Sequence, residues 1–198
     1  MNQKINLKKT IFCCFGLNRS GKSYFIKNAI ISNYRCIVFD PNGEYASKDG
    51  SFNPSNCDYY IPKKTSYPGI ALEFENFLDW FKKNKSKYDL LIIDEADSVF
   101  PNKKPLYPNA DNLKGKFRHN EWGNIGIGFA CRRPAQLFTD FPSLSYYLFI
   151  FGNKGAADIQ RLNSESEGLG DLAKQLDVSK HEYILVNPDR SYHRMPPI

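Results

Sequence analysis

Eight residues near the start of the chain have the types and the spacing needed to bind phosphate groups. They read GLNRSGKS and match the complete pattern G-x-x-x-x-G-K-[ST]. Glycines let backbone N–H groups surround phosphate oxygens, the lysine reaches the β- and γ-phosphates, and the last hydroxyl helps to hold Mg²⁺. An ordinary Gly- and Ser-rich turn is the alternative. We expect ATP and Mg²⁺ as cofactors of this Walker A loop, in contact with Gly16, Leu17, Asn18, Arg19, Ser20, Gly21, Lys22, Ser23 and Tyr24.

A second candidate site is an apolar run that ends in two carboxylates. Residues 90–95 read LLIIDE, which is the Walker B pattern. A buried strand can place Asp94 beside Ser23 to complete the Mg²⁺ shell, with Glu95 aimed at the water that attacks the γ-phosphate. Glu95 would then be the general base, and Lys22 would assist at the phosphates. The alternative is that both acids only complement the positive end of a helix.

Short apolar runs alternate with helical patterns along most of the chain. This alternation predicts an α/β fold of three layers, with a mainly parallel central sheet between helices. Ligands of such sheets bind at the carboxyl ends of the strands, where both motifs fall. The expected strands span 10–15, 36–40, 90–94, 125–130, 146–151 and 182–186, and the expected helices begin at Lys22 and cover 72–83 and 113–122.

Composition indicates one ordinary globular domain over residues 1–198. The chain is 41% apolar with a mean hydropathy of −0.51, and no apolar run reaches the roughly 18 residues that a membrane span needs. Its first ten residues, MNQKINLKKT, lack the apolar core of an export signal, so we expect synthesis in the cytosol without export. The five cysteines form no C-x-x-C pair and are expected to be core thiols in a reducing compartment.

Basic residues give the chain a net charge of +6 and a pI near 9.0. This balance favours a polyanionic partner, with a solvated basic surface as the alternative. Two segments are expected to be irregular, 47–56 and the long basic loop 100–117, and the Pro-rich basic tail 187–198 is expected to be a docking segment or a frayed end. The candidate contacts to a nucleic-acid backbone are Lys103, Lys104, Lys114 and Lys116. Tyr107 and Phe117 are interleaved with these lysines and Arg118.

Four motifs in order along the chain resemble the FtsK/HerA superfamily of ring-forming DNA translocases. They are GLNRSGKS, VFDPNGEY, LLIIDEAD and GFACRRPAQL, and the resemblance covers residues 11–151. In that family a strand that ends in D-x-x-x-E-Y follows the phosphate loop, and a polar residue before Arg-Pro closes the strand after Walker B. The small size and the R-R-P-A-Q-L form look most like the genome-packaging ATPases of icosahedral viruses with an internal membrane. The tetrad DEAD also occurs in RNA helicases, which need two tandem domains.

The resemblance implies roles for further residues. It assigns Asp40, Glu44 and Gln136 to the nucleotide site. Arg132 stands where cellular relatives usually have Gln, so either Arg132 or Gln136 would sense the γ-phosphate; the alternative is that Arg132 and its neighbour pair with acids such as Asp40 or Glu44. The competing candidates for an arginine that reaches the neighbouring subunit's nucleotide are Arg118, Arg132 and Arg133.

The same resemblance implies the partners. They would be DNA, held without sequence preference and double-stranded, other copies of this chain in a pentameric or hexameric ring, and a capsid or viral membrane protein. The place of action would be the host cytoplasm or the virion. The alternatives are a related motor for phage assembly or plasmid DNA transfer, a small P-loop kinase, and a nucleotide-gated binding module that hydrolyses slowly.

Overall fold

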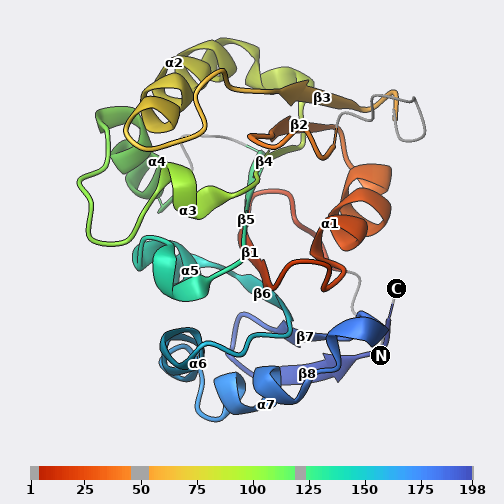
Figure 1. Cartoon of the computed structure of the whole chain (residues 1–198). Coiled ribbons are helices and arrows are strands. Elements are labelled where there is room, and N and C mark those ends of the chain that lie inside the picture. Colours follow the sequence, from red (N-terminus) through yellow and green to blue (C-terminus); the bar gives the residue numbers. More distant parts are fainter. Residues whose placement is uncertain (1–4, 46–53, 119–123, 198) are drawn as a thin grey trace.

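An eight-stranded sheet forms the middle of the molecule, in the order β3-β2-β4-β5-β1-β6-β7-β8 (Figure 1). The computed structural model describes residues 5–45, 54–118 and 124–197, apart from the side chains of 114–118. Strands β1 to β6 run parallel, whereas β7 and β8 pair antiparallel at one edge. The strands are β1 Ile11–Gly16, β2 Cys36–Phe39, β3 Cys57–Tyr60, β4 Leu90–Ile93, β5 Gly126–Cys131, β6 Tyr147–Phe151, β7 Tyr183–Val186 and β8 Tyr192–Met195.

Strand β1 lies between β5 and β6, and all its residues are buried. Alternate side chains of a strand point to opposite faces of the sheet. Cys13 and Phe15 accordingly pack into one hydrophobic core cluster, while Phe12 and Cys14 pack into the other. A strand that is apolar on both faces needs helices on both sides, which confirms the three-layer prediction.

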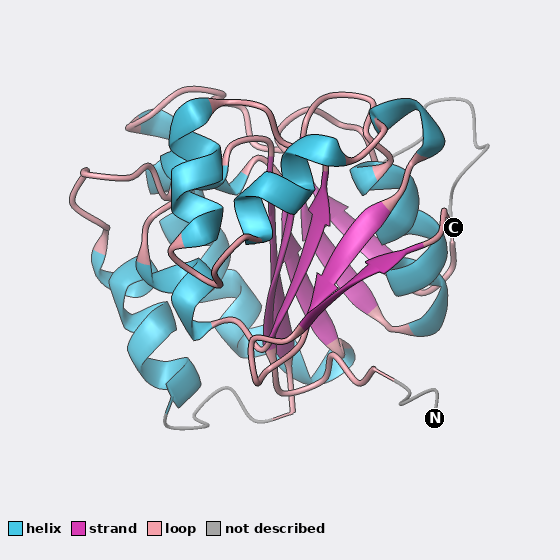
Figure 2. Cartoon of the chain, turned by 90° about the horizontal axis from the view of Figure 1, so that it is seen from below, coloured by secondary structure: helices cyan, strands magenta, loops and turns pink. Residues whose placement is uncertain are grey.

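Helices cover both faces of the sheet (Figure 2). The helix after the phosphate loop begins as α1 (Lys22–Phe25), continues as a π-helical segment (Ile26–Ile30), and packs into one core cluster. The other cluster receives side chains from α2 and the helices that follow it. No helix in the described part of the chain is long and apolar enough to cross a membrane. The helices from α2 onward are α2 Gly69–Asn84, α3 Ala96–Val99, α4 Pro108–Arg118, α5 Asp140–Leu144, α6 Ala156–Asn163 and α7 Leu169–Gln175.

The prediction of a long irregular loop over 100–117 is wrong in its second half. Helix α4 begins at Pro108, because proline is tolerated in the first turn of a helix. The carboxylate of Glu75 accepts hydrogen bonds from the backbone N–H groups of Asn109 (2.8 Å) and Ala110 (2.7 Å), and so satisfies the start of the helix. The helix expected over 113–122 therefore begins earlier. Residues 119–122, and most of the loop expected over 47–56, lie outside the described residues.

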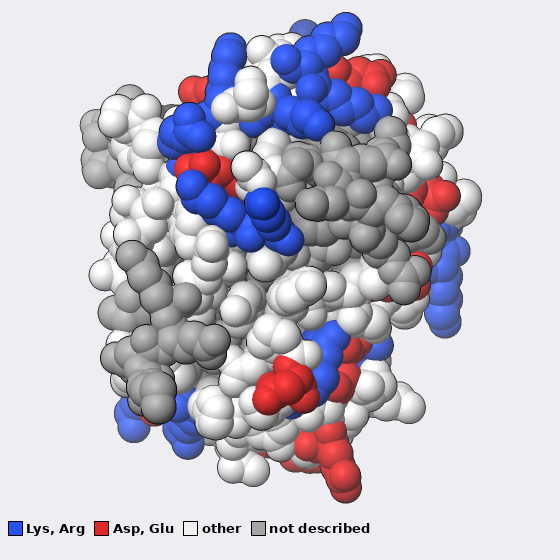
Figure 3. Space-filling view, turned by 180° about the vertical axis from the view of Figure 1, so that it is seen from behind, with Lys and Arg blue, Asp and Glu red and all other residues white. Residues whose placement is uncertain are grey.

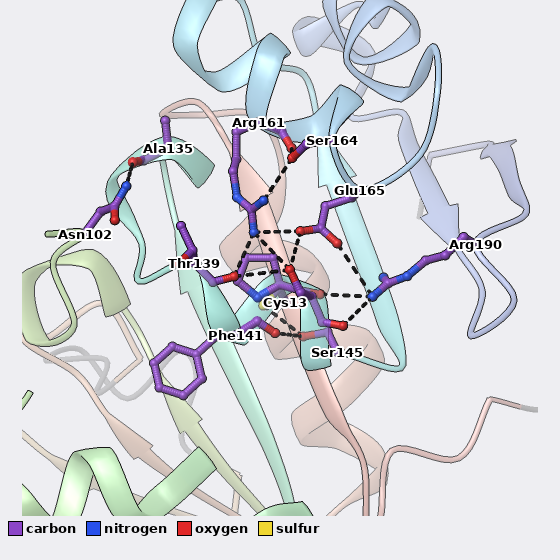
Figure 4. Close-up of polar contacts among 12 residues, drawn as sticks. Cys13, Asn102, Ala135, Thr139, Phe141, Ser145, Arg161, Ser164, Glu165 and Arg190 are labelled. Carbon is purple, nitrogen blue, oxygen red and sulfur yellow. Dashed lines mark hydrogen bonds and ion pairs between the residues drawn. The ribbon is translucent and has the colours of Figure 1, made fainter. Parts of the chain in front are cut away.

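Of the two expectations for 187–198, a docking segment or a frayed end, the frayed end is wrong for the residues that form β8. Strand β8 pairs with β7, and Arg190 in the turn between them has a left-handed φ of 66°. Its Nη2 donates a hydrogen bond to the carbonyl oxygen of Ser143 (2.7 Å) and lies 3.6 Å from Glu165. The side chain of Glu165 is only 5% exposed and also pairs with Arg161, as Figure 4 shows. The chain end is therefore tied to the region around α5.

The five cysteines are free and buried, which confirms that they are core thiols. Burial raises the pKa of the Cys13 thiol to about 12, although its contact with the Ser145 hydroxyl opposes this rise. A thiol of this kind stays protonated at neutral pH and is a poor nucleophile.

Candidate nucleotide-binding site

The phosphate loop connects the end of β1 to the start of α1, as its motif predicts. A Cβ added at Gly16 would lie 2.4 Å from the carbonyl oxygen of Phe151, so no larger residue fits there. Gly21 has a φ of 100°, which side-chain-bearing residues rarely adopt, and it directly precedes the first helical residue, Lys22. Both glycines of the motif are therefore required by the backbone geometry.

A cavity of about 700 Å³ opens over this loop. Glu44, Glu95 and Arg132 lie in its wall together with the loop, although they come from three other parts of the chain. Lys22 is the most buried charged group among them, with 8% of its surface exposed. The cavity is lined by Leu17, Asn18, Arg19, Ser20, Gly21, Lys22, Ser23, Tyr24, Asn42, Glu44, Glu95, Arg132 and His181.

Asp94 follows the last residue of β4 and is only 2% exposed. Burial raises the pKa of its carboxyl to about 7; the charge of Lys22 opposes this rise, and Glu95 and Glu44 add to it. Its Oδ1 atom is buried and has no hydrogen-bond partner among the described residues. An unsatisfied carboxylate oxygen surrounded by other acids fits a divalent cation. The described residues include no group of three or more His, Cys, Asp or Glu that could hold a metal, and Mg²⁺ at nucleotide sites typically uses one or two carboxylates with the substrate phosphates.

Glu95 is held at both of its carboxylate oxygens. The side-chain amide of Asn42 donates a hydrogen bond to Oε1 at 3.2 Å, and Arg132 Nε lies 3.5 Å from Oε2. The backbone of Glu95 is left-handed, with φ 45° and ψ 44°. Such a conformation costs a non-glycine residue on the order of 1 kcal/mol or more and is frequent at functional sites.

The segment after β2 places Glu44 in the cavity but keeps Asp40 out of it. Glu44 accepts a hydrogen bond from the Ser23 hydroxyl at 3.0 Å. Asp40 is fully buried, and its two oxygens accept the backbone N–H groups of Glu44 (3.0 Å) and Tyr45 (2.8 Å). The assignment of Asp40 to nucleotide contact is therefore corrected: this carboxylate shapes the turn that carries Glu44.

A second cavity of about 500 Å³ adjoins the first and shares Glu95 and Arg132 with it. Gln136 and Lys103 line this second cavity and are absent from the lining of the first. The structure thus separates Gln136 from the phosphate loop, whereas Arg132 lies at the boundary of both cavities.

Two of the three arginines proposed as fingers have described side chains, and these two are in different surroundings. Arg132 pairs with Glu95, as described above. Arg133 lies outside the nucleotide cavity and pairs at 3.3 Å with Asp158, which is 2% exposed. The expectation that both arginines pair with acids holds, but their partners are not the predicted ones. The side chains of Arg118, Lys114 and Lys116 lie outside the described residues.

His181 lines the cavity as well, and the sequence did not indicate a role for this residue. It follows the short turn Val178–Lys180 and has a left-handed φ of 54°. A Cβ added at Gly21 would lie 3.1 Å from its Nδ1 atom, so the imidazole lies against the phosphate loop. A single exposed histidine far along the chain carries no pattern that links it to residue 21. Asn42 was likewise unassigned, although it lies inside the second motif.

Together, the mostly parallel sheet, its flanking helices and the loop at the end of β1 define a P-loop NTPase fold. The chain is similar in structure to the genome packaging NTPase B204 from Sulfolobus turreted icosahedral virus 2, solved with AMPPCP (TM-score 0.78, 19% identity) and with ATP-gammaS (TM-score 0.79, 20% identity). B204 of Sulfolobus turreted icosahedral virus, described as a DNA-packaging ATPase, gives a TM-score of 0.79 at 19% identity. Each match covers 98% of this chain and 100% of the other. At these identities the likeness establishes the fold.

No protein-family model matches the sequence. A search of the curated proteins also gives no match.

Proposed function

We propose that this protein is an ATPase that moves DNA and packages a viral genome into a preformed capsid. The observation that carries the proposal is the meeting of Lys22 and Ser23 from the loop with Glu95, which follows β4, at one cavity. The buried carboxyl of Asp94 directly precedes Glu95, and the charge of Lys22 acts on it. This combination is typical of hydrolysis of the γ-phosphate. The similarity in fold to viral packaging NTPases, over nearly the whole chain, supports the choice of packaging.

The residues of the site would have different roles in hydrolysis. Backbone N–H groups of the loop and the Lys22 ammonium bind the phosphates. Ser23 and Asp94 would hold Mg²⁺, which when bound neutralises charge on the β- and γ-phosphates. Glu95 accepts the proton of the attacking water, and Arg132 supplies positive charge at the γ-phosphate. Tyr24 and His181 line the same cavity and are available to contact the rest of the nucleotide.

The proposed DNA contacts begin with Lys103 and Lys104, which are exposed in the loop between α3 and α4. Lysine side chains bind the DNA backbone through charge, without reading its sequence. Lys103 also lines the second cavity beside Glu95, which gives a short route between a DNA contact and the hydrolytic site. Figure 3 shows Lys and Arg side chains gathered at the upper end of one face, the end where α2 lies. Lys114, Lys116 and Arg118 remain proposed contacts to DNA or to a neighbouring subunit.

The remaining parts of the proposal follow from packaging. The chain would act as a homo-oligomeric ring of five or six copies, at a capsid or viral membrane component, in the host cytoplasm or the virion. A related motor for phage assembly or plasmid DNA transfer would use the same site. A small P-loop kinase is the weaker alternative, because a kinase has no need for an acid such as Glu95 beside the metal ligand.

The direct test of the chemistry is Glu95→Gln. We expect this variant to bind a fluorescent ATP analogue as the wild type does and to lose about 10²- to 10⁴-fold in kcat, because the amide cannot accept a proton. Lys22→Ala should instead lose nucleotide binding. Retained DNA-stimulated hydrolysis by Glu95→Gln would contradict the proposal.

A further inference from the structure

We infer that Asn42 is a positioning residue for hydrolysis: its side-chain amide fixes the Glu95 carboxylate so that Oε2 is the oxygen that accepts the proton of the attacking water. This inference rests on the proposed function, in which Glu95 is the general base. It adds a residue that neither the Walker patterns nor the comparisons assign. Asn42 and Glu95 line the same cavity, and Asn42 Nδ2 donates to Glu95 Oε1 at 3.2 Å.

The fold brings these two side chains together from neighbouring strands. Strands β2 and β4 pair in parallel, with Phe39 opposite Ile93. Asn42 lies three residues after Phe39, and Glu95 lies two residues after Ile93. The backbone N–H of Asp94 also donates to the carbonyl oxygen of Phe39 at 3.0 Å. The two side chains therefore leave the same edge of the sheet from adjacent strands.

The turn that carries Asn42 is held from within. The buried carboxylate of Asp40 accepts the N–H groups of Glu44 and Tyr45, and its carbonyl oxygen accepts the N–H of Gly43 at 3.3 Å. Gly43 has a φ of 66°, which closes the turn. A side chain on such a braced turn can orient a partner with little loss of its own freedom.

The backbone and the carboxylate of Glu95 are held by different groups. The N–H and the hydroxyl of Ser98 both donate to the carbonyl oxygen of Glu95, at 2.8 and 2.6 Å. These bonds hold the left-handed backbone but do not orient the carboxylate. Among the described residues the carboxylate has two polar partners, Asn42 on Oε1 and Arg132 on Oε2.

When the triphosphate binds, Asn42 stays bound to the Glu95 carboxylate, whereas Arg132 leaves it. Arg132 is about half exposed, and its Nε lies 3.5 Å from Oε2, which is too long for a strong hydrogen bond. It also lines the cavity that would receive the phosphates, whose negative charge competes for the guanidinium. The neutral amide of Asn42 has no such competing attraction. Oε2 is released to the water while Oε1 stays bound to Asn42.

The test compares Asn42→Ala with the wild type and Glu95→Gln in steady-state ATP hydrolysis, with DNA present. For Asn42→Ala we expect kcat to fall about ten- to a hundredfold while KM and the Kd of a fluorescent ATP analogue change less than about twofold, because the loss is one of orientation. Asn42→Gln keeps an amide on a longer side chain and should recover part of kcat. Asn42→Asp should be no better than Asn42→Ala, since two carboxylates repel. Asn84→Ala removes an amide that bonds to the carbonyl oxygen of Trp80 and should behave as wild type.

Three results would overturn the inference while leaving the proposed function intact. They are a kcat of Asn42→Ala equal to or above that of the wild type, a change confined to KM, which would make Asn42 a nucleotide contact, and a kcat of Asn42→Gln no better than that of Asn42→Ala. Each presupposes an active wild type and an inactive Glu95→Gln. A wild-type protein that binds ATP without hydrolysing it would overturn the proposed function, and this inference with it.

Discussion

At the scale of single residues, the role of Arg133 follows from its ion pair with Asp158. Asp158 is almost fully buried and accepts hydrogen bonds from Arg133 Nε (3.3 Å) and from the backbone N–H of Ala135 (3.1 Å). A buried carboxylate that loses a charged partner is costly. This pairing indicates a structural role for Arg133 rather than a contact to a phosphate.

Arg133→Ala should therefore lower the stability of the fold and leave ATP hydrolysis intact. We expect a loss of about 1–3 kcal/mol in the free energy of unfolding, because the Asp158 carboxylate loses a charged hydrogen bond. ATP binding should persist. The matched control is Arg194→Ala, which removes an exposed ion pair with Glu182 and should cost less than about 1 kcal/mol. A variant of unchanged stability whose kcat collapses would instead make Arg133 a catalytic arginine.

The sequence predicted the local chemistry of the site but not its tertiary contacts. The phosphate loop and the acids after β4 are recognisable because their neighbours in the chain are also their neighbours in space. His181 and Asp158 are not, because each reaches its partner through the packing of distant segments. Asp40 was misassigned for a related reason: a polar side chain that braces its own turn has the same sequence signature as one that binds a ligand.

At the scale of elements, Arg190 connects the hairpin of β7 and β8 to the region around α5. This residue lies in the turn of the hairpin and donates to Ser143 at the end of α5. It also faces Glu165. The hairpin is at the edge of the sheet, where β8 has a single neighbouring strand. An edge hairpin of this kind is weakly held unless its turn is anchored.

Arg190→Ala should destabilise the hairpin of β7 and β8 without affecting nucleotide binding. We expect faster hydrogen exchange at the β8 amides and a fall of about 1–2 kcal/mol in stability. Arg190→Lys keeps the charge but not the planar fork, and should give an intermediate result. Unchanged exchange in β8 would show that strand pairing alone holds the hairpin.

The elements that the sequence predicted are those with continuous apolar runs. Strands β1, β2, β4, β5, β6 and β7 are buried along nearly all their length, which makes them conspicuous. Edge strands β3 and β8 are partly exposed and were missed. The start of α4 was missed because the acid that completes it, Glu75, is on another helix. The helices α6 and α7 are short and were not predicted.

At the scale of the whole molecule, the proposed ring would complete the nucleotide site with residues of a neighbouring copy. Arg132 lines the nucleotide cavity and would move from Glu95 to the γ-phosphate, whereas Arg133 pairs with Asp158 and lies outside that cavity. In the proposed ring, a second arginine at the γ-phosphate would come from a neighbouring copy. Hydrolysis would then require that copies of the chain assemble, and DNA would bring these copies together.

The most direct test of the central claim is steady-state ATP hydrolysis over a series of protein concentrations, at fixed low salt, with and without long double-stranded DNA. For a ring-forming motor we expect that DNA stimulates hydrolysis and that the rate rises more steeply than linearly with protein concentration, because active sites form between subunits. Glu95→Gln is the matched inactive control. Hydrolysis per subunit that is independent of both DNA and protein concentration would contradict the account and indicate a monomeric NTPase.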